Sequence, residues 1–285
     1  MKKEISNKIT DFAKWSINKI LSEHDKNYFY IDISKKFMPN IDIMTKHGNL
    51  SFFCPDELPI WRAETFFSKE PETLEWIDCM EKGSRLWDIG ANVGCYSLYA
   101  GKAGIRTFSF EPSSANYYIL NANISKNSLD KIISAYCIAF SSQSEVAYLN
   151  MDSLNLGGAI NTFSEAKDEI SFEGSDKKLK IGFSQGMISF SIDEFIHFYG
   201  LEVPEHIKID VDGLEKQIIF GAVNTLKNQK LRTVLIELDD NSPDTTNEII
   251  KIFEESGFKI KTKAHSEMIE NSGQYGNIYN YIFSR

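Results

Sequence analysis

A short apolar strand that ends in an acid and runs directly into a glycine-containing turn constrains the fold of this chain most. Residues 85–94 read RLWDIGANVG, helix-compatible sequence follows, and a second strand, RTFSF, ends at Glu111. A strand, a glycine turn, a helix and a strand that ends in an acid is how α/β folds bind a nucleoside ribose. The acid suits this ligand because two ribose hydroxyls donate hydrogen bonds and one carboxylate can accept both.

The spacing of the glycines indicates which ribose-containing ligand suits this turn. A dinucleotide-binding turn reads G-x-G-x-x-G and places a pyrophosphate over a helix N-terminus. Here the pattern is G-x-x-x-G, from Gly90 to Gly94, and the preceding Asp88 would repel a pyrophosphate but attract a cation. S-adenosylmethionine fits, because it has a ribose, a sulfonium and an ammonium group but no phosphate. The alternative is that Asp88 caps the helix and Gly90 only turns the chain; Glu111, about twenty residues from the turn, favours the cofactor.

Strand-like and helix-like segments alternate from residue 85 onward, which indicates an α/β fold with a parallel, doubly wound sheet. Ahead of them we predict an N-terminal extension, residues 1–75, with an amphipathic helix over residues 5–23 and short β-like segments such as YFYIDI (28–33). The cofactor-binding domain is then residues 76–285. We expect the extension to lie on the acceptor side or to form an oligomer contact, so a homodimer is one possibility.

Composition and charge limit the classes of binding partner that we expect. The chain of 285 residues has a formal net charge of −9, and its basic run, KKLK at 177–180, is short. Affinity for nucleic acid depends on phosphate contacts by Lys and Arg, so we expect no nucleic-acid substrate. The four cysteines form no C-x-x-C pair, and no apolar run reaches the length of a membrane span. The N-terminus has no apolar signal region, so we expect a cytoplasmic protein without a membrane span.

An ordered series of motifs resembles a known family. DIGANVGCYSLYA, FEP, SIDEF, KIDVDGLEKQIIFGAVNTL and VLIEL follow one another as in the FkbM-type methyltransferases of the class I S-adenosylmethionine-dependent superfamily. The similarity extends over roughly residues 60–260. It implies a Rossmann-like, mostly parallel sheet of about seven strands whose last strand is antiparallel. It also implies O-methylation of a hydroxyl on a sugar, such as a surface polysaccharide or its precursor, or on a secondary metabolite.

The resemblance also implies where the cofactor binds. The methionine part would be lined by Asp88, Gly90, Asn92 and Gly94; the ribose would be bound by Glu111 and the adenine edge shaped by Pro112. The family often has Leu-Ser-Asp after the third strand, where this chain has Phe140-Ser141-Ser142. The backbone near Ala139, or the side chain of Ser141, would then take the place of that Asp at the adenine.

The fourth strand of the sheet supplies the candidates for catalysis. In KIDVDG, strand alternation puts Lys208, Asp210 and Asp212 on one side, and Asp210 is our first candidate for a general base or for the residue that orients the acceptor. Asp212 is an alternative, although it is as well suited to cap the next helix, and the family often has Glu there. Glu237 on the fifth strand completes the predicted catalytic set, unless it only pairs with Lys208.

Other polar residues have two interpretations each. Asp210, Asp240 and Asn241 end adjacent strands and would together suit magnesium, although DDNSPD is also an ordinary solvated turn. His206 precedes the fourth strand at its amino end, so we expect it at the surface. Trp61, Phe66 and Phe67 would form a sugar platform or belong to the core. The Gly157-Gly158 segment would be an acceptor-side loop or a β-turn.

Three functions compete on this sequence. The first is S-adenosylmethionine-dependent O-methylation of a sugar or glycan, and the second is methylation of a small secondary metabolite on the same fold. An N-methyltransferase of a nucleic-acid base is disfavoured, because KIDVDG lacks the proline- and aromatic-rich motif usual there. The third is a non-catalytic Rossmann-like binding protein, which would need neither Asp88 nor Glu111.

Overall fold

The computed structural model divides the chain into two units, Met1–Pro39 and Asn40–Arg285. The described residues are 2–159, 161–165, 169–171, 178–265, 267–270 and 276–285. No described helix is long and apolar enough to cross a membrane.

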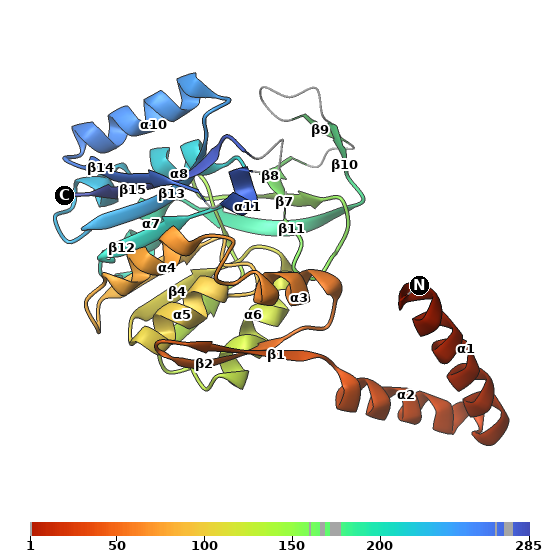
Figure 1. The fold of residues 1–285 in the computed structure, drawn as a ribbon. Coiled ribbons are helices and arrows are strands. Elements are labelled where there is room, and N and C mark those ends of the chain that lie inside the picture. Colours follow the sequence, from red (N-terminus) through yellow and green to blue (C-terminus); the bar gives the residue numbers. More distant parts are fainter. Residues whose placement is uncertain (1, 160, 166–168, 172–177, 266, 271–275) are drawn as a thin grey trace. The chain divides into compact units, whose positions relative to one another are not determined.

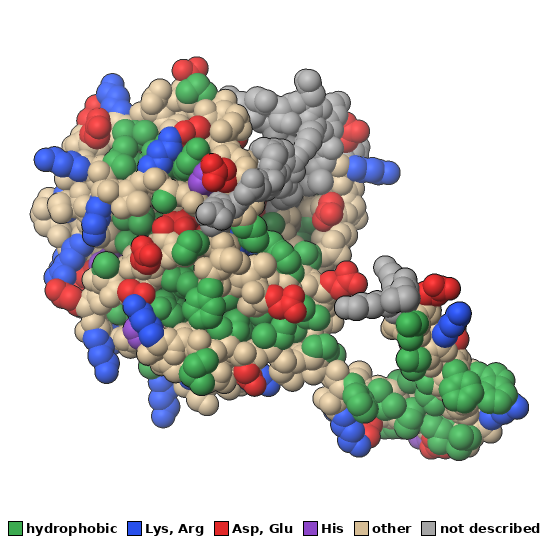
Figure 2. Space-filling view, viewed as in Figure 1, with side chains coloured by type: hydrophobic (Ala, Val, Ile, Leu, Met, Phe, Trp, Pro, Cys, Tyr) green, Lys and Arg blue, Asp and Glu red, His purple; other side chains and the backbone are tan. Residues whose placement is uncertain are grey.

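The N-terminal unit consists of two helices, α1 (Lys2–Ile20) and α2 (Glu23–Phe37). The predicted amphipathic helix is confirmed as α1, but the prediction of a strand at YFYIDI was wrong, because that segment lies inside α2. The Ser22 hydroxyl starts α2 by accepting a hydrogen bond from the backbone N–H of Asp25, and lysines near its end suit the helix dipole. Hydrophobic side chains lie exposed on both helices (Figure 2).

The second unit is built on a seven-stranded sheet in the order β14-β15-β13-β12-β3-β4-β5. The strands are β3 (Arg85–Ile89), β4 (Arg106–Phe110), β5 (Ile133–Tyr136), β12 (His206–Ile209), β13 (Thr233–Asp239), β14 (Lys259–Ala264) and β15 (Ile278–Ser284). Neighbours pair in parallel except β15, which is antiparallel to both β13 and β14. The predicted mostly parallel Rossmann-like sheet of seven strands, with an antiparallel last strand, is therefore confirmed (Figure 1).

Helices cover both faces of this sheet. Strand alternation sends Trp87 and Ile89 into one core and Leu86 into the other, so each face has its own hydrophobic cluster. The first cluster takes in residues of α7 (Ile192–Tyr199), α8 (Glu215–Phe220), α9 (Val223–Lys227) and α10 (Pro243–Glu255). The second takes in residues of α3 (Glu57–Glu64), α4 (Pro71–Asp78), α5 (Cys95–Ala103) and α6 (Ser114–Lys126).

The hairpin of β1 (Asn40–Thr45) and β2 (Gly48–Phe53) belongs to the second unit. Leu50 and Phe52 of β2 are buried in the core beside α5 and α6. The β2 backbone is also tied to α6, since the Asn123 and Asn127 side chains accept from the Phe53 and Ser51 N–H groups. The second unit thus begins at Asn40, within the predicted extension of residues 1–75.

A smaller sheet follows β5 in the chain. It has the order β6-β11-β7-β8, from β6 (Ala139–Phe140), β7 (Glu145–Met151), β8 (Thr162–Ser164) and β11 (Phe183–Phe190). A separate pair joins β9 (Glu169–Ser171) to β10 (Lys178–Lys180), and α11 spans Glu267–Glu270. In the large sheet, β4 and β5 lie on one side of β3, and β12, β13, β15 and β14 lie on the other. The strand order therefore reverses its direction between β3 and β12. Ligands of open α/β sheets bind at such a switch point, at the carboxyl ends of the strands.

Candidate active site

A cavity of about 300 Å³ opens at this switch point. Its walls come from the carboxyl ends of β3, β4, β12 and β13, from the smaller sheet and from the segment that enters α4. Of the predicted site residues, these line it: Gly90, Asn92, Glu111, Pro112, Ala139, Asp210, Asp212 and Glu237. Asp88, Gly94, Ser141, Asp240 and Asn241 do not belong to that lining.

The glycine turn after β3 forms the floor of the cavity. The Gly90 and Ala91 N–H groups both donate to the carbonyl of Phe110, at 2.9 and 3.0 Å, which ties the turn to the end of β4. Gly90 has φ +86°, and a Cβ there would lie 1.8 Å from the carbonyl oxygen of Asp210. Only glycine fits this contact, because both the positive φ and the close backbone exclude a side chain. The turn therefore sets how closely β12 approaches β3.

Glu111 occupies the end of β4, inside the cavity. One carboxylate oxygen accepts from the Asn92 N–H at 2.8 Å, and the other accepts from the Ser113 N–H at 2.8 Å. Burial raises the pKa of this carboxyl to about 7, although the Ser113 and Asn92 N–H groups work in the opposite direction. The oxygen bound by Ser113 also accepts from the Asn116 amide at 3.5 Å, while the oxygen bound by Asn92 keeps a further lone pair for a ligand hydroxyl.

A loop closes over this end of the cavity. The carbonyl of Gly158 accepts from the side-chain amides of Asn92 and Asn116, at 2.8 and 3.0 Å, and the Gly157 N–H donates to Asn116 Oδ1 at 2.8 Å. The Gly157 carbonyl accepts from Arg62 Nε at 2.9 Å. Three elements therefore fix the loop beside Glu111, and the Gly157-Gly158 segment is more than an isolated turn.

Asp88 lies beneath the turn. It is 1% exposed; one carboxylate oxygen accepts from the Ser97 hydroxyl at 2.5 Å, and Ser97 in turn accepts from Ser109 at 2.7 Å. These contacts join β3, α5 and β4. The other Asp88 oxygen has no hydrogen-bond partner among the described residues. Its predicted contact with the cofactor would therefore need a ligand group to reach below the turn. Gly94, with φ +91°, begins α5 without lining the cavity.

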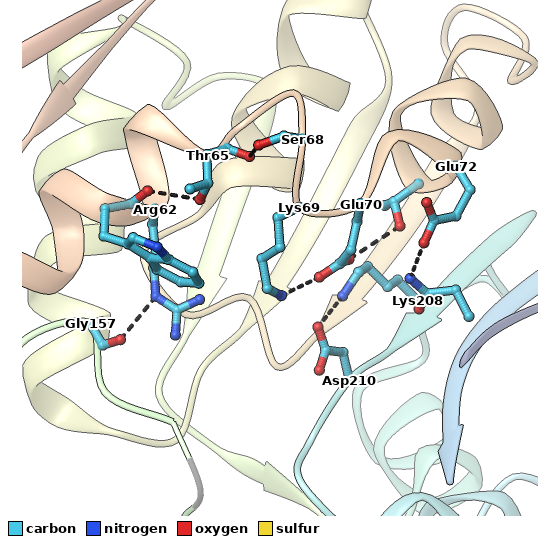
Figure 3. Close-up of polar contacts among 12 residues, drawn as sticks. Arg62, Thr65, Ser68, Lys69, Glu70, Glu72, Gly157, Lys208 and Asp210 are labelled. Carbon is cyan, nitrogen blue, oxygen red and sulfur yellow. Dashed lines mark hydrogen bonds and ion pairs between the residues drawn. The ribbon is translucent and has the colours of Figure 1, made fainter. Parts of the chain in front are cut away.

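Charged side chains alternate along the wall nearest α4, as Figure 3 shows. Lys208 is 1% exposed; its ammonium group donates to Asp210 at 2.7 Å and lies 5.0 Å from the centre of the Tyr96 ring. Lys69 forms an ion pair with Glu70, whose second oxygen accepts from the Thr73 hydroxyl at 3.2 Å. The predicted partner of Lys208 was Glu237, but the end of its own strand supplies the partner instead.

These pairs make Asp210 and Glu237, two of the three predicted catalytic carboxylates, differ in acidity. Burial favours the neutral form of Asp210, but the charges of Lys208 and Lys69 outweigh it and hold the pKa of Asp210 below its ordinary value. Burial and the negative charge of Asp210 raise the pKa of Glu237 well above its ordinary value. Glu237 in its ionised form is therefore the more basic carboxylate of the two.

The predicted metal set is not brought together. Asp240 accepts from the Tyr281 hydroxyl at 2.7 Å and pairs with Lys263, and Asn241 accepts from Asn277 at 2.8 Å. Both lie beyond the end of β13 and outside the cavity lining. Glu70, Asp210 and Glu237 do have carboxylate oxygens within 4.8 Å of one another. Two of these three, however, already have lysine partners at the same wall.

Two further predictions near β12 are corrected. Asp212 does not cap the next helix: α8 begins after Leu214 without a side-chain cap, and Asp212 has φ +58° at the cavity wall. His206 is not at the surface but only 6% exposed, with Nδ1 2.7 Å from the Thr233 hydroxyl and its ring edge-on to Trp76. It is buried because α4 covers that end of β12.

The sequence did not single out several residues that line the cavity. Arg62, Lys69, Glu70 and Glu72 come from α3 and the entry to α4, and Asn116 comes from α6. Asn280 of β15 donates to Glu72 at 2.7 Å on the far wall. The lysine–glutamate pair directly before Pro71 was the available signal, because charged residues at the start of a helix over a sheet often face its carboxyl edge.

Similarity to known proteins agrees with this architecture. The family model described as "Methyltransferase FkbM domain" matches residues 88–260, more than half of the chain. The chain therefore belongs to a family of methyltransferases. That family is the FkbM methyltransferase family. A curated relative, the hexuronic acid methyltransferase AglP of Haloferax volcanii, is 24% identical over 180 residues, which span 63% of this chain and 66% of the relative.

Solved structures give more distant matches. A methyltransferase FkbM from Methylobacillus flagellatus KT superposes with a TM-score of 0.46 at 14% identity, over 73% of this chain and 45% of that one. Fibrillarin from Aeropyrum pernix, solved with natively bound S-adenosyl-L-methionine, gives a TM-score of 0.42 at 11% identity, over 75% and 74% of the two chains.

Proposed function

We propose that the chain is an S-adenosylmethionine-dependent O-methyltransferase that acts on a hydroxyl of a sugar or glycan. The observation that carries the proposal is the Glu111 carboxylate, held by two backbone N–H groups at the end of β4 and directed into the cavity beside the Gly90 turn. Two adjacent ribose hydroxyls match such an acceptor. Bound S-adenosylmethionine would supply an activated methyl group on a positively charged sulfur.

The residues of this cavity fit that cofactor. Gly90 lines the cavity without a side chain, so a ligand can lie close to the backbone of the turn. Pro112, Ile138, Ala139 and Phe140 give an apolar surface near Glu111 that suits an adenine ring. The ionised carboxylates of Asp210 and Glu70 lie toward the other end, where a sulfonium and an ammonium group are favoured.

Glu237 is the proposed general base. A sugar hydroxyl is a weak acid, so transfer to its oxygen is helped when a carboxylate accepts the proton. No hydrogen bond within the described residues occupies its carboxylate, and in its ionised form it is a stronger base than Asp210. Asp210, held ionised by Lys208 and Lys69, would keep negative charge beside the sulfonium. Protein residues would otherwise contribute chiefly by aligning the acceptor with the methyl group.

A sugar acceptor is supported by the cavity wall opposite Glu111. Glu72, Asn280 and His265 line it together with Glu237, and a polar wall of this kind can hydrogen-bond several hydroxyls. Trp61, 40% exposed at the edge of the cavity, offers an aromatic face for a sugar ring. Phe66 instead belongs to the core at 2% exposure, and Phe67 does not line the cavity. The relative named as a hexuronic acid methyltransferase points to the same class of acceptor.

Calorimetric titration with S-adenosylmethionine tests the cofactor, with wild-type protein and Glu111→Ala. We expect binding that the substitution weakens by about tenfold or more, since it removes an acceptor for hydroxyl donors in a buried site. Methyl transfer to a panel of sugars, followed by mass spectrometry, tests the reaction. Glu237→Gln should lower the rate of transfer while leaving the cofactor affinity unchanged. Absence of cofactor binding in the wild-type protein would exclude the proposal.

A further inference from the structure

We infer that the guanidinium group of Arg62 is a binding site for a ligand carboxylate, placed where two cavities of this protein meet. The inference rests on the proposed function, because it concerns ligands of the same site. It goes beyond that function by naming the residue that recognises an acidic group.

Arg62 lies between the two cavities on α3. It lines the main cavity and also a smaller one of about 40 Å³, which is bounded by the Gly90–Val93 turn, Tyr96 and Lys208. Its Nε group donates to the Gly157 carbonyl at 2.9 Å, which fixes the direction of the side chain. Figure 3 shows the two remaining nitrogens on the side away from α3. The fork is therefore oriented before any ligand binds.

The other cations at this site already have carboxylate partners. Lys69 pairs with Glu70, and Lys208 pairs with Asp210 at 2.7 Å. Within the part of the chain that the structure describes, Arg62 forms no ion pair with any Asp or Glu. The Glu111 and Asp210 carboxylates and the Trp61 ring act on this half-buried guanidinium only from a distance, so a ligand carboxylate can form a direct hydrogen-bonded pair with it.

The chemistry of the group selects a carboxylate. A guanidinium stays charged at all ordinary pH values and offers parallel N–H donors that match the two oxygens of a carboxylate. Two ligands of the proposed reaction can supply one: the amino-acid end of S-adenosylmethionine, through the smaller cavity, and an acidic sugar acceptor, through the main cavity beside Trp61. Both contain the same chemical group, so experiment must assign the source.

The cofactor arm compares S-adenosylmethionine with its decarboxylated form, which lacks the carboxylate alone. If Arg62 binds the cofactor, the wild-type protein should prefer the intact cofactor by about ten- to a hundredfold, the usual range for a charged hydrogen-bonded pair. Arg62→Gln should remove most of that preference. Arg106→Gln, at an exposed arginine outside both cavities, should keep it.

The acceptor arm compares methyl glucuronide with methyl glucoside, with S-adenosylhomocysteine present. If Arg62 binds the acceptor, the wild-type protein should prefer the glucuronide, Arg62→Gln should abolish that preference, and the cofactor preference should not change. Loss of either preference in Arg62→Gln supports the inference and assigns the carboxylate. The inference is overturned if both preferences survive the substitution, or if the wild-type protein shows neither preference while binding S-adenosylmethionine.

The Arg62→Lys variant separates a role of Arg62 in ligand binding from a role in folding. It retains the charge but not the fork, so the preference should fall by a smaller factor than in Arg62→Gln. If Arg62→Gln does not fold, Arg62→Lys carries the test, and a preference equal to that of the wild type would contradict the inference. A wild-type protein that binds neither form of the cofactor would instead refute the proposed function, and this inference with it.

Discussion

At the scale of single residues, Gly90 shows how a backbone contact fixes the site. Its missing Cβ lets the carbonyl of Asp210 approach the turn after β3, and that contact sets the start of the Asp210-Val211-Asp212 segment at the cavity wall. A side chain here would have to displace backbone rather than a flexible neighbour. The shape of the cavity therefore depends on glycine at this position.

Gly90→Ala should destabilise the protein more than Gly83→Ala. Both glycines have similar positive φ values, +86° and +89°, but a Cβ at Gly83 meets nothing within 4 Å. Gly83→Ala should therefore cost about 1 kcal/mol of backbone strain, and Gly90→Ala several kcal/mol, because a steric clash is added. Unfolding in urea measures both. Equal losses would show that the contact with Asp210 is not restrictive.

Cofactor affinity should increase with pH through the titration of Glu111. Its pKa in the free protein is raised to about 7, so the carboxylate that accepts from ribose forms as the pH rises from 6 to 8. Affinity should increase by about tenfold over that interval. Glu111→Gln should abolish the increase. Glu215→Gln is the matched control, because the pKa of Glu215 is also raised to about 7 by burial but Glu215 does not line the cavity.

At the scale of elements, β12 carries charge and histidine into the interior. Lys208 faces α5 and pairs with Asp210 at the carboxyl end, while His206 is covered by α4 at the amino end. The strand is buried along its whole length, so each polar group on it depends on one specific partner.

Stability should decrease in acid because of His206. Burial lowers its pKa from 6.5 to about 4, so between these values the unfolded chain binds a proton that the folded chain does not. The folded state should lose about 2 kcal/mol from this group between pH 7 and pH 5. His206→Asn should show a smaller loss over the same interval, whereas His197→Asn, at an exposed histidine on α7, should behave as the wild type does. The urea midpoints of unfolding of the three proteins at pH 7 and pH 5 test this prediction.

The sequence predicted elements well where local signals agreed with packing. The β3–turn–β4 unit was predicted from a strand, a glycine turn and a strand-ending acid in the expected order, and Glu111 and Gly90 both line the cavity. Arg62, Lys69 and Glu70 were missed because they precede the sheet in the chain and reach it only through the packing of α3 and α4. YFYIDI looked like a strand because its aromatic and β-branched residues favour one, but the Ser22 cap and flanking charges support a helix.

At the scale of the whole molecule, the unit Asn40–Arg285 has hydrophobic clusters and a cavity of its own. Its buried hydrophobic clusters draw on residues from position 41 onward, and the described lining of the cavity begins at Trp61. The exposed apolar side chains of α1 and α2 therefore contribute nothing to these cores.

Removal of residues 1–39 should leave residues 40–285 folded. We expect an unchanged unfolding midpoint and unchanged affinity for S-adenosylmethionine, because no core or cavity residue is lost. Calorimetry of the shortened and full-length proteins makes the comparison. A large drop in either quantity would show that the N-terminal helices support the site.

The loop at Gly157-Gly158 also has a consequence for observing the site at work. The Gly157 amide donates to Asn116 Oδ1 next to Glu111, so its exchange with deuterium requires the loop to open. A ligand that packs against the closed loop should lower the rate of this exchange by a factor that grows with the ratio of ligand concentration to Kd. Deuterium exchange at the Gly157 amide therefore reports whether a ligand occupies the cavity. Exchange of that amide at an unaltered rate under saturating ligand would show that the loop and the ligand are independent.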